Sequence, residues 1–195
     1  MKHTLKMTFL AFILILASCR PSPQKAENYY DNIIMPLEDV FEKEEALISL
    51  INTEVDNPND SSEVLSGTNT TDNAAFCKKI DMAFSNFQIQ ITVSKNKVKS
   101  LPDFDKNDNL KKTALDLLNE YDGICKKEYS EIIQIVKIPE EKYSLENDDE
   151  FLKLSEIIDN KIHEKTSILI KDLKLFAKKY NFEIKNDSIK RTDQQ

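Results

Sequence analysis

The chain has 195 residues, and its 34 acidic residues outnumber 27 lysines and arginines, which gives a net charge of −7. This excess of acid argues against binding to a nucleic acid backbone, which depends on clustered lysine and arginine. Only two glycines occur, Gly67 and Gly123, so a glycine-rich phosphate loop and a dinucleotide-binding fingerprint are excluded.

The first 19 residues have the pattern of a bacterial lipoprotein signal. Lys2 and Lys6 precede the apolar run 7–16, which is too short to span a bilayer but typical of a signal peptide. Leu16-Ala17-Ser18-Cys19 then matches a lipobox, the site that bacterial signal peptidase II cleaves after the cysteine has received diacylglycerol. We expect residues 1–18 to be a lipoprotein signal peptide and Cys19 to carry the lipid. An ordinary signal peptide or an uncut hydrophobic anchor is the alternative.

Lipidation of Cys19 would anchor the chain in a membrane of the bacterial cell envelope. Stable anchoring needs at least two acyl chains, and a triacylated cysteine exceeds that number. Arg20 follows the cysteine, in place of the aspartate that retains many proteobacterial lipoproteins at the inner membrane. We therefore expect the outer membrane or the cell surface. Removal of residues 1–18 leaves a net charge of −9, so the acyl anchor is expected to hold the membrane without help from a basic patch.

The rest of the chain predicts a helical domain between polar segments. Residues 19–28 contain prolines and no apolar period, which indicates a lipid-proximal tether, and residues 186–195 form a polar tail. Apolar residues three and four apart predict helices at about 32–55, 74–99, 109–137 and 149–181, within a domain that covers 29–185. Residues 56–73 are rich in Asp, Asn, Ser and Thr, which predicts a long loop.

Three local features complicate this prediction. Pro36 indicates that the first helix starts near Asn32 or bends at the proline. Phe87–Val93 alternates apolar and polar residues and by itself predicts a strand, but the wider window keeps the helical period. Asn147-Asp148-Asp149 is the candidate N-cap of the last helix.

Four amphipathic helices with polar connections predict an all-α fold, an antiparallel up-down-up-down four-helix bundle of long helices. A looser pair of helical hairpins and an elongated coiled coil are the alternatives. Cys77 and Cys125 lie symmetrically about the expected turn at Leu101-Pro102, so they are a possible disulfide in an envelope compartment. Two buried thiols are the alternative.

Few residue patterns suggest chemistry. Asp159 and His163 lie four residues apart with Glu164 beside them, but a di-iron bundle needs two Glu-x-x-His pairs and His163 is the one histidine left after residues 1–18. We therefore predict no metal, no cofactor and no catalytic residue. The acidic pairs Glu44-Glu45 and Asp148-Asp149 are interpreted as solvated surface.

The tyrosines are interpreted as core residues. We expect each ring to pack in the core and each hydroxyl to remain in water, with a ligand groove as the alternative. They are Tyr29, Tyr30, Tyr121, Tyr129, Tyr143 and Tyr180.

The chain resembles an uncharacterised family of bacterial surface lipoproteins that fold as helical bundles. The resemblance is carried by Tyr30-Asp31, Glu128-Tyr129 and the run 176–182. It implies fold and surface placement and provides no catalytic residues.

Taken together, these features predict a non-enzymatic envelope lipoprotein that serves as an interaction or structural module. The expected partners are the membrane, through acylated Cys19, and an unidentified envelope or extracellular protein, with no nucleic acid. A module that holds a small apolar ligand such as a lipid or haem between its helices is the alternative. A carboxylate-based hydrolase is the least favoured function.

Overall fold

The structure is a computed structural model that describes residues 21–55, 69–106 and 109–184. The predicted signal peptide 1–18, Cys19, the polar tail 186–195 and most of the predicted loop 56–73 lie outside these described residues. Lipidation of Cys19 therefore stays a prediction.

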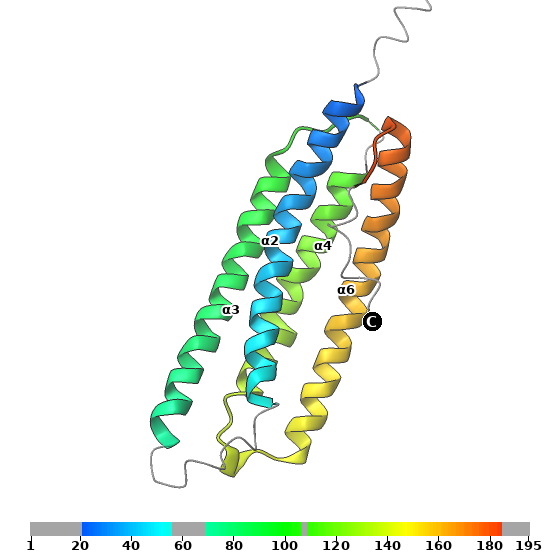
Figure 1. The fold of residues 1–195 in the computed structure, drawn as a ribbon. Helices are drawn as coiled ribbons and strands as arrows, with labels where there is room; N and C mark the ends of the chain where they lie inside the picture. The colour runs from blue at the N-terminus through cyan, green and yellow to red at the C-terminus, as the bar shows by residue number, and fades with distance from the viewer. Residues whose placement is uncertain (1–20, 56–68, 107–108, 185–195) are drawn as a thin grey trace, which may run out of the picture.

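The described part of the chain is helical and contains no β-strand. The long helices are α2 (Pro23–Val55), α3 (Asn69–Ser100), α4 (Leu110–Ile124) and α6 (Leu145–Tyr180) (Figure 1). A π-helical segment, η2 (Cys125–Tyr129), continues α4 into the short helix α5 (Ser130–Ile135), and the 3-10 helix η3 (Glu140–Lys142) precedes α6. The all-α prediction is confirmed.

The long helices lie lengthwise beside one another and enclose one apolar core. α2 packs chiefly on α3, α3 also packs on α4, and α4 packs on α6 (Figure 1). The segment Phe87–Val93 is helical, as the wider period predicted: Phe87 and Ile91 are buried, whereas Ile89 is 58% exposed. That spacing places one face of α3 in the core and the opposite face in solvent.

The first helix begins nine residues earlier than predicted. α2 starts at Pro23, where the missing N–H costs nothing in a first turn, and the hydroxyl of Ser22 accepts a hydrogen bond from the backbone N–H of Lys25 at 3.3 Å. Ala26 is fully buried in the core. The tether predicted for 19–28 is therefore wrong for residues 23–28, because a serine cap followed by proline starts the helix there.

Pro36 lies inside α2, so the alternative of a helix start near Asn32 is wrong. The fully buried hydroxyl of Ser94 donates a hydrogen bond to the carbonyl oxygen of Pro36 at 2.6 Å. This contact joins α3 to α2 at the proline.

The other helix boundaries also differ from the prediction. α3 starts at Asn69, inside the predicted loop 56–73. α6 starts at Leu145 with Ser144 as its N-cap, and the Ser144 backbone N–H donates to Asn147 Oδ1 at 2.9 Å. Asn147-Asp148-Asp149 is therefore not the cap but part of the first turns. α6 ends at Asn181, whose φ of 56° is the left-handed conformation that closes many helices.

Candidate functional site

A half-buried carboxylate joins α2 to α4 and to the π-helical segment that follows it. The hydroxyl of Tyr121 donates to Glu44 Oε2 and the hydroxyl of Tyr129 donates to Glu44 Oε1, each at 2.7 Å. Both tyrosine rings are buried and Glu44 is half-buried. We call these three residues the Glu44 cluster. A carboxylate that accepts two hydroxyls is held in one orientation by charge-assisted hydrogen bonds.

Aromatic rings enclose the Glu44 cluster. Phe87 of α3 lies edge-on to both tyrosines, with ring centroids 6.0 Å from Tyr121 and 5.4 Å from Tyr129. Phe41 lies 6.0 Å from Tyr121 on the α2 side. Edge-to-face contacts of this kind are favourable between aromatic rings. The cluster therefore has an apolar wall made by α2 and α3.

The π-helical segment η2 buries two consecutive polar side chains that serve different helices. Tyr129 contacts Glu44 of α2, whereas Glu128, only 1% exposed, accepts a hydrogen bond from Lys161 of α6 at 2.9 Å through Oε1. Among the described residues, Glu128 Oε2 has no hydrogen-bond partner. A π turn adds one residue to the helix and often occurs where a side chain must be redirected for function.

The pKa shifts of the two consecutive residues Glu128 and Tyr129 leave one charged and the other neutral. Burial raises the pKa of Tyr129 well above 10.0, and the Glu44 carboxylate adds to the rise. Burial by itself raises the pKa of Glu128, but the Lys161 ammonium and its other contacts hold it below 4.5. At neutral pH, therefore, Tyr129 is a neutral donor and Glu128 is a charged acceptor.

Cys125 lies within the same segment and is unsuited to act as a nucleophile. Burial, followed by the Asp122 and Glu44 carboxylates, raises the pKa of its thiol from 9.0 to about 12. The thiolate is the reactive form of cysteine, so this thiol is inert at neutral pH.

No disulfide joins Cys77 to Cys125. Asp122 lies beside Lys95 at 3.3 Å, and Cys125 is one helical turn from Asp122. Cys77 precedes Lys95 by 18 residues, or about 27 Å of α3 at 1.5 Å per residue. The thiols are therefore on the order of 20 Å apart, whereas a disulfide needs Cα atoms within about 7 Å. The prediction failed because it took Leu101-Pro102 as the centre of the turn, whereas the connection continues to Asn109 and places Lys95, not Cys77, near the level of Cys125.

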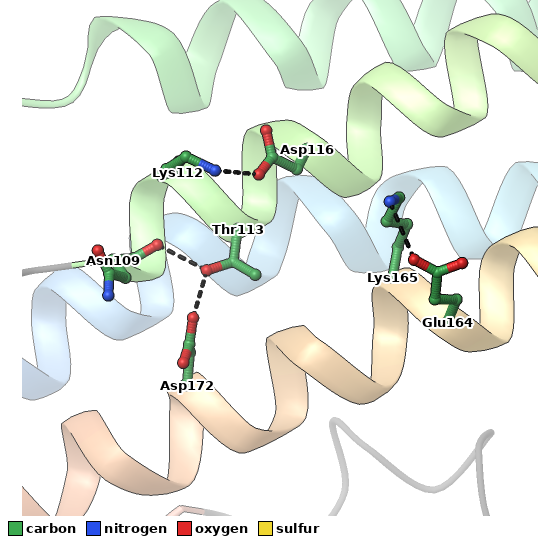
Figure 2. Close-up of polar contacts among 7 residues, drawn as sticks. All are labelled: Asn109, Lys112, Thr113, Asp116, Glu164, Lys165 and Asp172. Atoms are coloured by element: carbon green, nitrogen blue, oxygen red, sulfur yellow. Dashed lines mark hydrogen bonds and ion pairs between the residues drawn. The ribbon is translucent and has the colours of Figure 1, made fainter.

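The predicted Asp159, His163 and Glu164 face is exposed on α6. Glu164 forms an ion pair with its neighbour Lys165 at 3.3 Å (Figure 2). Within the ranges that the structure describes, no group of three or more His, Cys, Asp or Glu side chains is arranged to hold a metal ion.

The acidic pairs behave differently from one another. Asp148 and Asp149 are exposed in the first turns of α6. In the other pair, Glu45 is exposed but Glu44 faces the core, so the interpretation of Glu44 as solvated surface is wrong. The sequence contains no local signal for this role, because the two tyrosines are 77 and 85 residues away.

The tyrosine rings are core residues as predicted, except Tyr143, which is 38% exposed. Their hydroxyls do not all remain in water, since Tyr121 and Tyr129 donate to Glu44 and Tyr180 donates to Asp105. That part of the interpretation is wrong, because Glu44 of α2 and Asp105 of the connection after α3 supply carboxylates to them.

A second polar contact ties the start of α4 to α6. Thr113 Oγ1 lies 2.6 Å from the carbonyl oxygen of Asn109 and 2.6 Å from Asp172 Oδ2 (Figure 2). A hydroxyl carries one proton, so it donates to one of these oxygens at a time. Lys112 pairs with Asp116 on the outer side of the same helix.

None of the helices in the described ranges has an apolar stretch long enough to cross a bilayer. No protein-family model, curated protein or solved structure matches the chain.

Proposed function

We propose that the protein is a lipid-anchored protein of the bacterial cell envelope, whose helical domain is a non-enzymatic interaction or structural module. The observation that carries the anchor is the lipobox Leu16-Ala17-Ser18-Cys19, directly after the short apolar run 7–16. The outer membrane or cell surface is the proposed location. The resemblance to surface lipoproteins of helical-bundle fold supports the same function.

The non-enzymatic role is supported by how the buried ionisable groups are used. Glu44 accepts two tyrosine hydroxyls, and Glu128 accepts a hydrogen bond from Lys161. Cys125 has a pKa of about 12 and stays protonated. A general acid or nucleophile needs a pKa near the working pH and access to substrate. The two glutamates instead join one helix to another, and the thiol has no contact among the described residues that would activate it.

We further propose that the long helical segments form an antiparallel up-down-up-down bundle. The contacts that support this order pair early residues of one helix with late residues of the next. Pro36 contacts Ser94 and Asp39 contacts Gln90 between α2 and α3. Between the third and fourth segments, Thr113 contacts Asp172 and Glu128 contacts Lys161. The colour gradient along neighbouring helices in Figure 1 runs in the same alternating sense.

A zero-length carbodiimide crosslink tests this order without mutation. The reagent should join Lys97 to Asp39, Lys95 to Asp122 and Lys161 to Glu120, whose carboxylates are partly exposed, and mass spectrometry of the digested monomer would identify these crosslinks. Crosslinks that instead join residues at opposite ends of the proposed neighbours would contradict the bundle order.

The anchor is tested by expressing the full chain and its Cys19→Ala variant in a Gram-negative host. We expect the wild-type mature protein to begin at Cys19 and to carry the added mass of the acyl chains, and to partition into the detergent phase. The variant should keep residues 1–18 and carry no acyl mass. Cys77→Ala is the matched control, since it removes a thiol outside the lipobox. A Cys19→Ala variant that is processed and membrane-bound like the wild type would contradict the anchor.

A further inference from the structure

One end of the domain is formed by segments that are distant in the sequence. We call it the proximal end: the start of α2, the last turn of α3 with the connection 101–106, the start of α4 and the last turns of α6 with residues 181–184, which lie together at one end of the long axis (Figure 1). Ring contacts join these segments, because Tyr29 lies 4.9 Å from Phe104 and 5.8 Å from Phe176.

The proximal end carries exposed lysines although the chain as a whole is acidic. Four of them form no ion pair with any residue that the structure describes, and their ammonium groups face solvent. They are Lys25, Lys99, Lys106 and Lys178. Four more lysines at this end are paired: Lys97 with Asp39, Lys111 with Asp103, Lys112 with Asp116 and Lys179 with Asp105.

The helix dipole explains only half of this charge. α3 and α6 end here, and lysines in a last turn are favourable at the negative end of a helix. α2 and α4 begin here, where acidic residues are favourable, yet neither has one in its first turn. The first turns instead contain Lys25 and, in α4, Lys111 and Lys112.

The opposite end of the domain has a different balance of charge. α6 begins there with Glu146 and Asp148 in its first turn, and neither α2 nor α5 has a basic residue in its last turn. Lysines also occur toward this end, Lys142 in η3 and Lys78 and Lys79 in α3. The two ends therefore differ in the balance of charge, with more lysine at the proximal end and more acid around the start of α6.

We propose that the proximal end docks on the phosphate groups of an anionic lipid bilayer, so that the domain stands on the membrane with its acidic end outward. This inference rests on the proposed lipidation of Cys19. Three residues lie between Cys19 and Pro23, so the two are at most about 14 Å apart along the chain. The anchor therefore holds the lysines close to the membrane surface, where attraction acts within a Debye length of about 8 Å.

The expectation that no basic patch assists the anchor followed from the net charge alone. The separation of charge along the long axis leads to a different expectation, in which lysines at the proximal end assist the anchor. Each lysine near an anionic surface adds about a five-fold preference for the docked orientation. The acidic end is repelled by the same surface, which favours the same orientation.

The test uses the mature lipidated chain on two kinds of vesicle, phosphatidylcholine alone and equal parts of phosphatidylcholine and phosphatidylglycerol. A membrane-impermeant acylating reagent labels exposed lysines, and mass spectrometry measures the rate at each one. On the anionic vesicles we expect Lys25 to be labelled about five-fold more slowly than on phosphatidylcholine. Lys142 at the acidic end should be labelled equally on both.

Two matched triple variants identify the cause of this protection. Lys99→Glu, Lys106→Glu and Lys178→Glu reverse charge at the proximal end and should remove the protection of Lys25. Lys78→Glu, Lys79→Glu and Lys142→Glu reverse the same charge elsewhere and should retain it. All six side chains are exposed and form no ion pair with a described residue, so both variants should remain folded at the assay temperature. Lys99 and Lys178 lie in last turns of helices, so the proximal variant should unfold at a somewhat lower temperature than the wild type.

The outcomes separate this inference from the anchor itself. A wild-type chain that does not float with phosphatidylcholine vesicles contradicts the anchor, since charge plays no part there. A chain that floats but labels Lys25 equally on both vesicles overturns the docking surface alone. Equal loss of protection in both triple variants also overturns it, because net charge would then be the cause. Protection by RNA or an acidic protein with none on anionic vesicles would assign the surface to another partner and overturn the lipid proposal.

Discussion

Replacement of Glu44 by leucine removes the acceptor that two buried hydroxyls share. Tyr121 and Tyr129 each donate to this carboxylate at 2.7 Å, and both rings are buried. A buried donor that loses its acceptor costs about 1–3 kcal/mol. For two hydroxyls we expect Glu44→Leu to lower the free energy of unfolding by about 4 kcal/mol. In a domain of this size each kcal/mol lowers Tm by about 2–4 °C.

The reasoning is tested by removing the donors as well. Replacing both partners of a hydrogen bond by apolar groups is nearly neutral, whereas removing one partner is not. The triple variant Glu44→Leu, Tyr121→Phe, Tyr129→Phe should therefore recover most of the stability that Glu44→Leu loses. The control is Glu45→Leu, at an exposed neighbouring position, which should change stability by less than about 0.5 kcal/mol.

Urea unfolding of the mature chain, followed by circular dichroism at neutral pH, measures all of these variants. The slope of the transition must stay constant for the free energies to be compared. A triple variant as unstable as Glu44→Leu would refute the shared-acceptor explanation, because the loss would then come from packing. A Glu44→Leu variant as stable as Glu45→Leu would refute it directly.

Three other predictions follow from the described contacts. Iodoacetamide at pH 8 should label half-buried Cys77 of the native protein before Cys125, because the rise in the pKa of Cys125 from 9.0 to about 12 lowers its thiolate fraction roughly a thousand-fold. Equal labelling of the two cysteines in peptide mass spectra would contradict the burial of Cys125. Gly123→Ala should raise the free energy of unfolding by about 1 kcal/mol, because alanine favours the helix and its Cβ would meet no atom within 4 Å. The measurement is Tm, and a lower Tm would contradict this prediction. The pKa of Glu128 in the folded protein lies below 4.5, so the stability that its charged form contributes should be complete above pH 4.5 and lost as pH falls through that folded pKa. Glu128→Gln should flatten this part of the curve of urea midpoint against pH, and an unchanged slope would count against the pairing of Glu128 with Lys161.

The helical fold could be predicted because its signal is local. Phe87 and Ile91 are buried four residues apart while Ile89 between them is exposed, so the period alone distinguishes helix from strand. The start of α2 was also present in the sequence, as Ser22 followed by Pro23, but the polar composition of the segment concealed it. In such cases the capping residues are a better guide than the apolar pattern.

The site and the register between helices could not be predicted, because both depend on contacts between distant residues. Glu44 and Glu45 look alike as a sequence pair, and only the facing helix decides which one enters the core. Which residue of α3 lies opposite Cys125 depends on the length of the connection after Ser100, and the apolar period within the helices does not give that length. Charge at the proximal end likewise becomes visible only once the four segments are assembled.

The π-helical segment Cys125–Tyr129 also shows how this helix accommodates one residue more than a regular α-helix would hold. A π turn contains about one residue more than an α turn, so the extra residue is absorbed in the wider turn and α5 continues in nearly the phase it would have without it. Deleting one residue between Cys125 and Tyr129 should therefore return the segment to an α-helix and leave Ile132 and Ile133 buried. The stability lost should be that of the contacts of Glu128 and Tyr129 within the segment. In this helix, a change of chain length is confined to one turn.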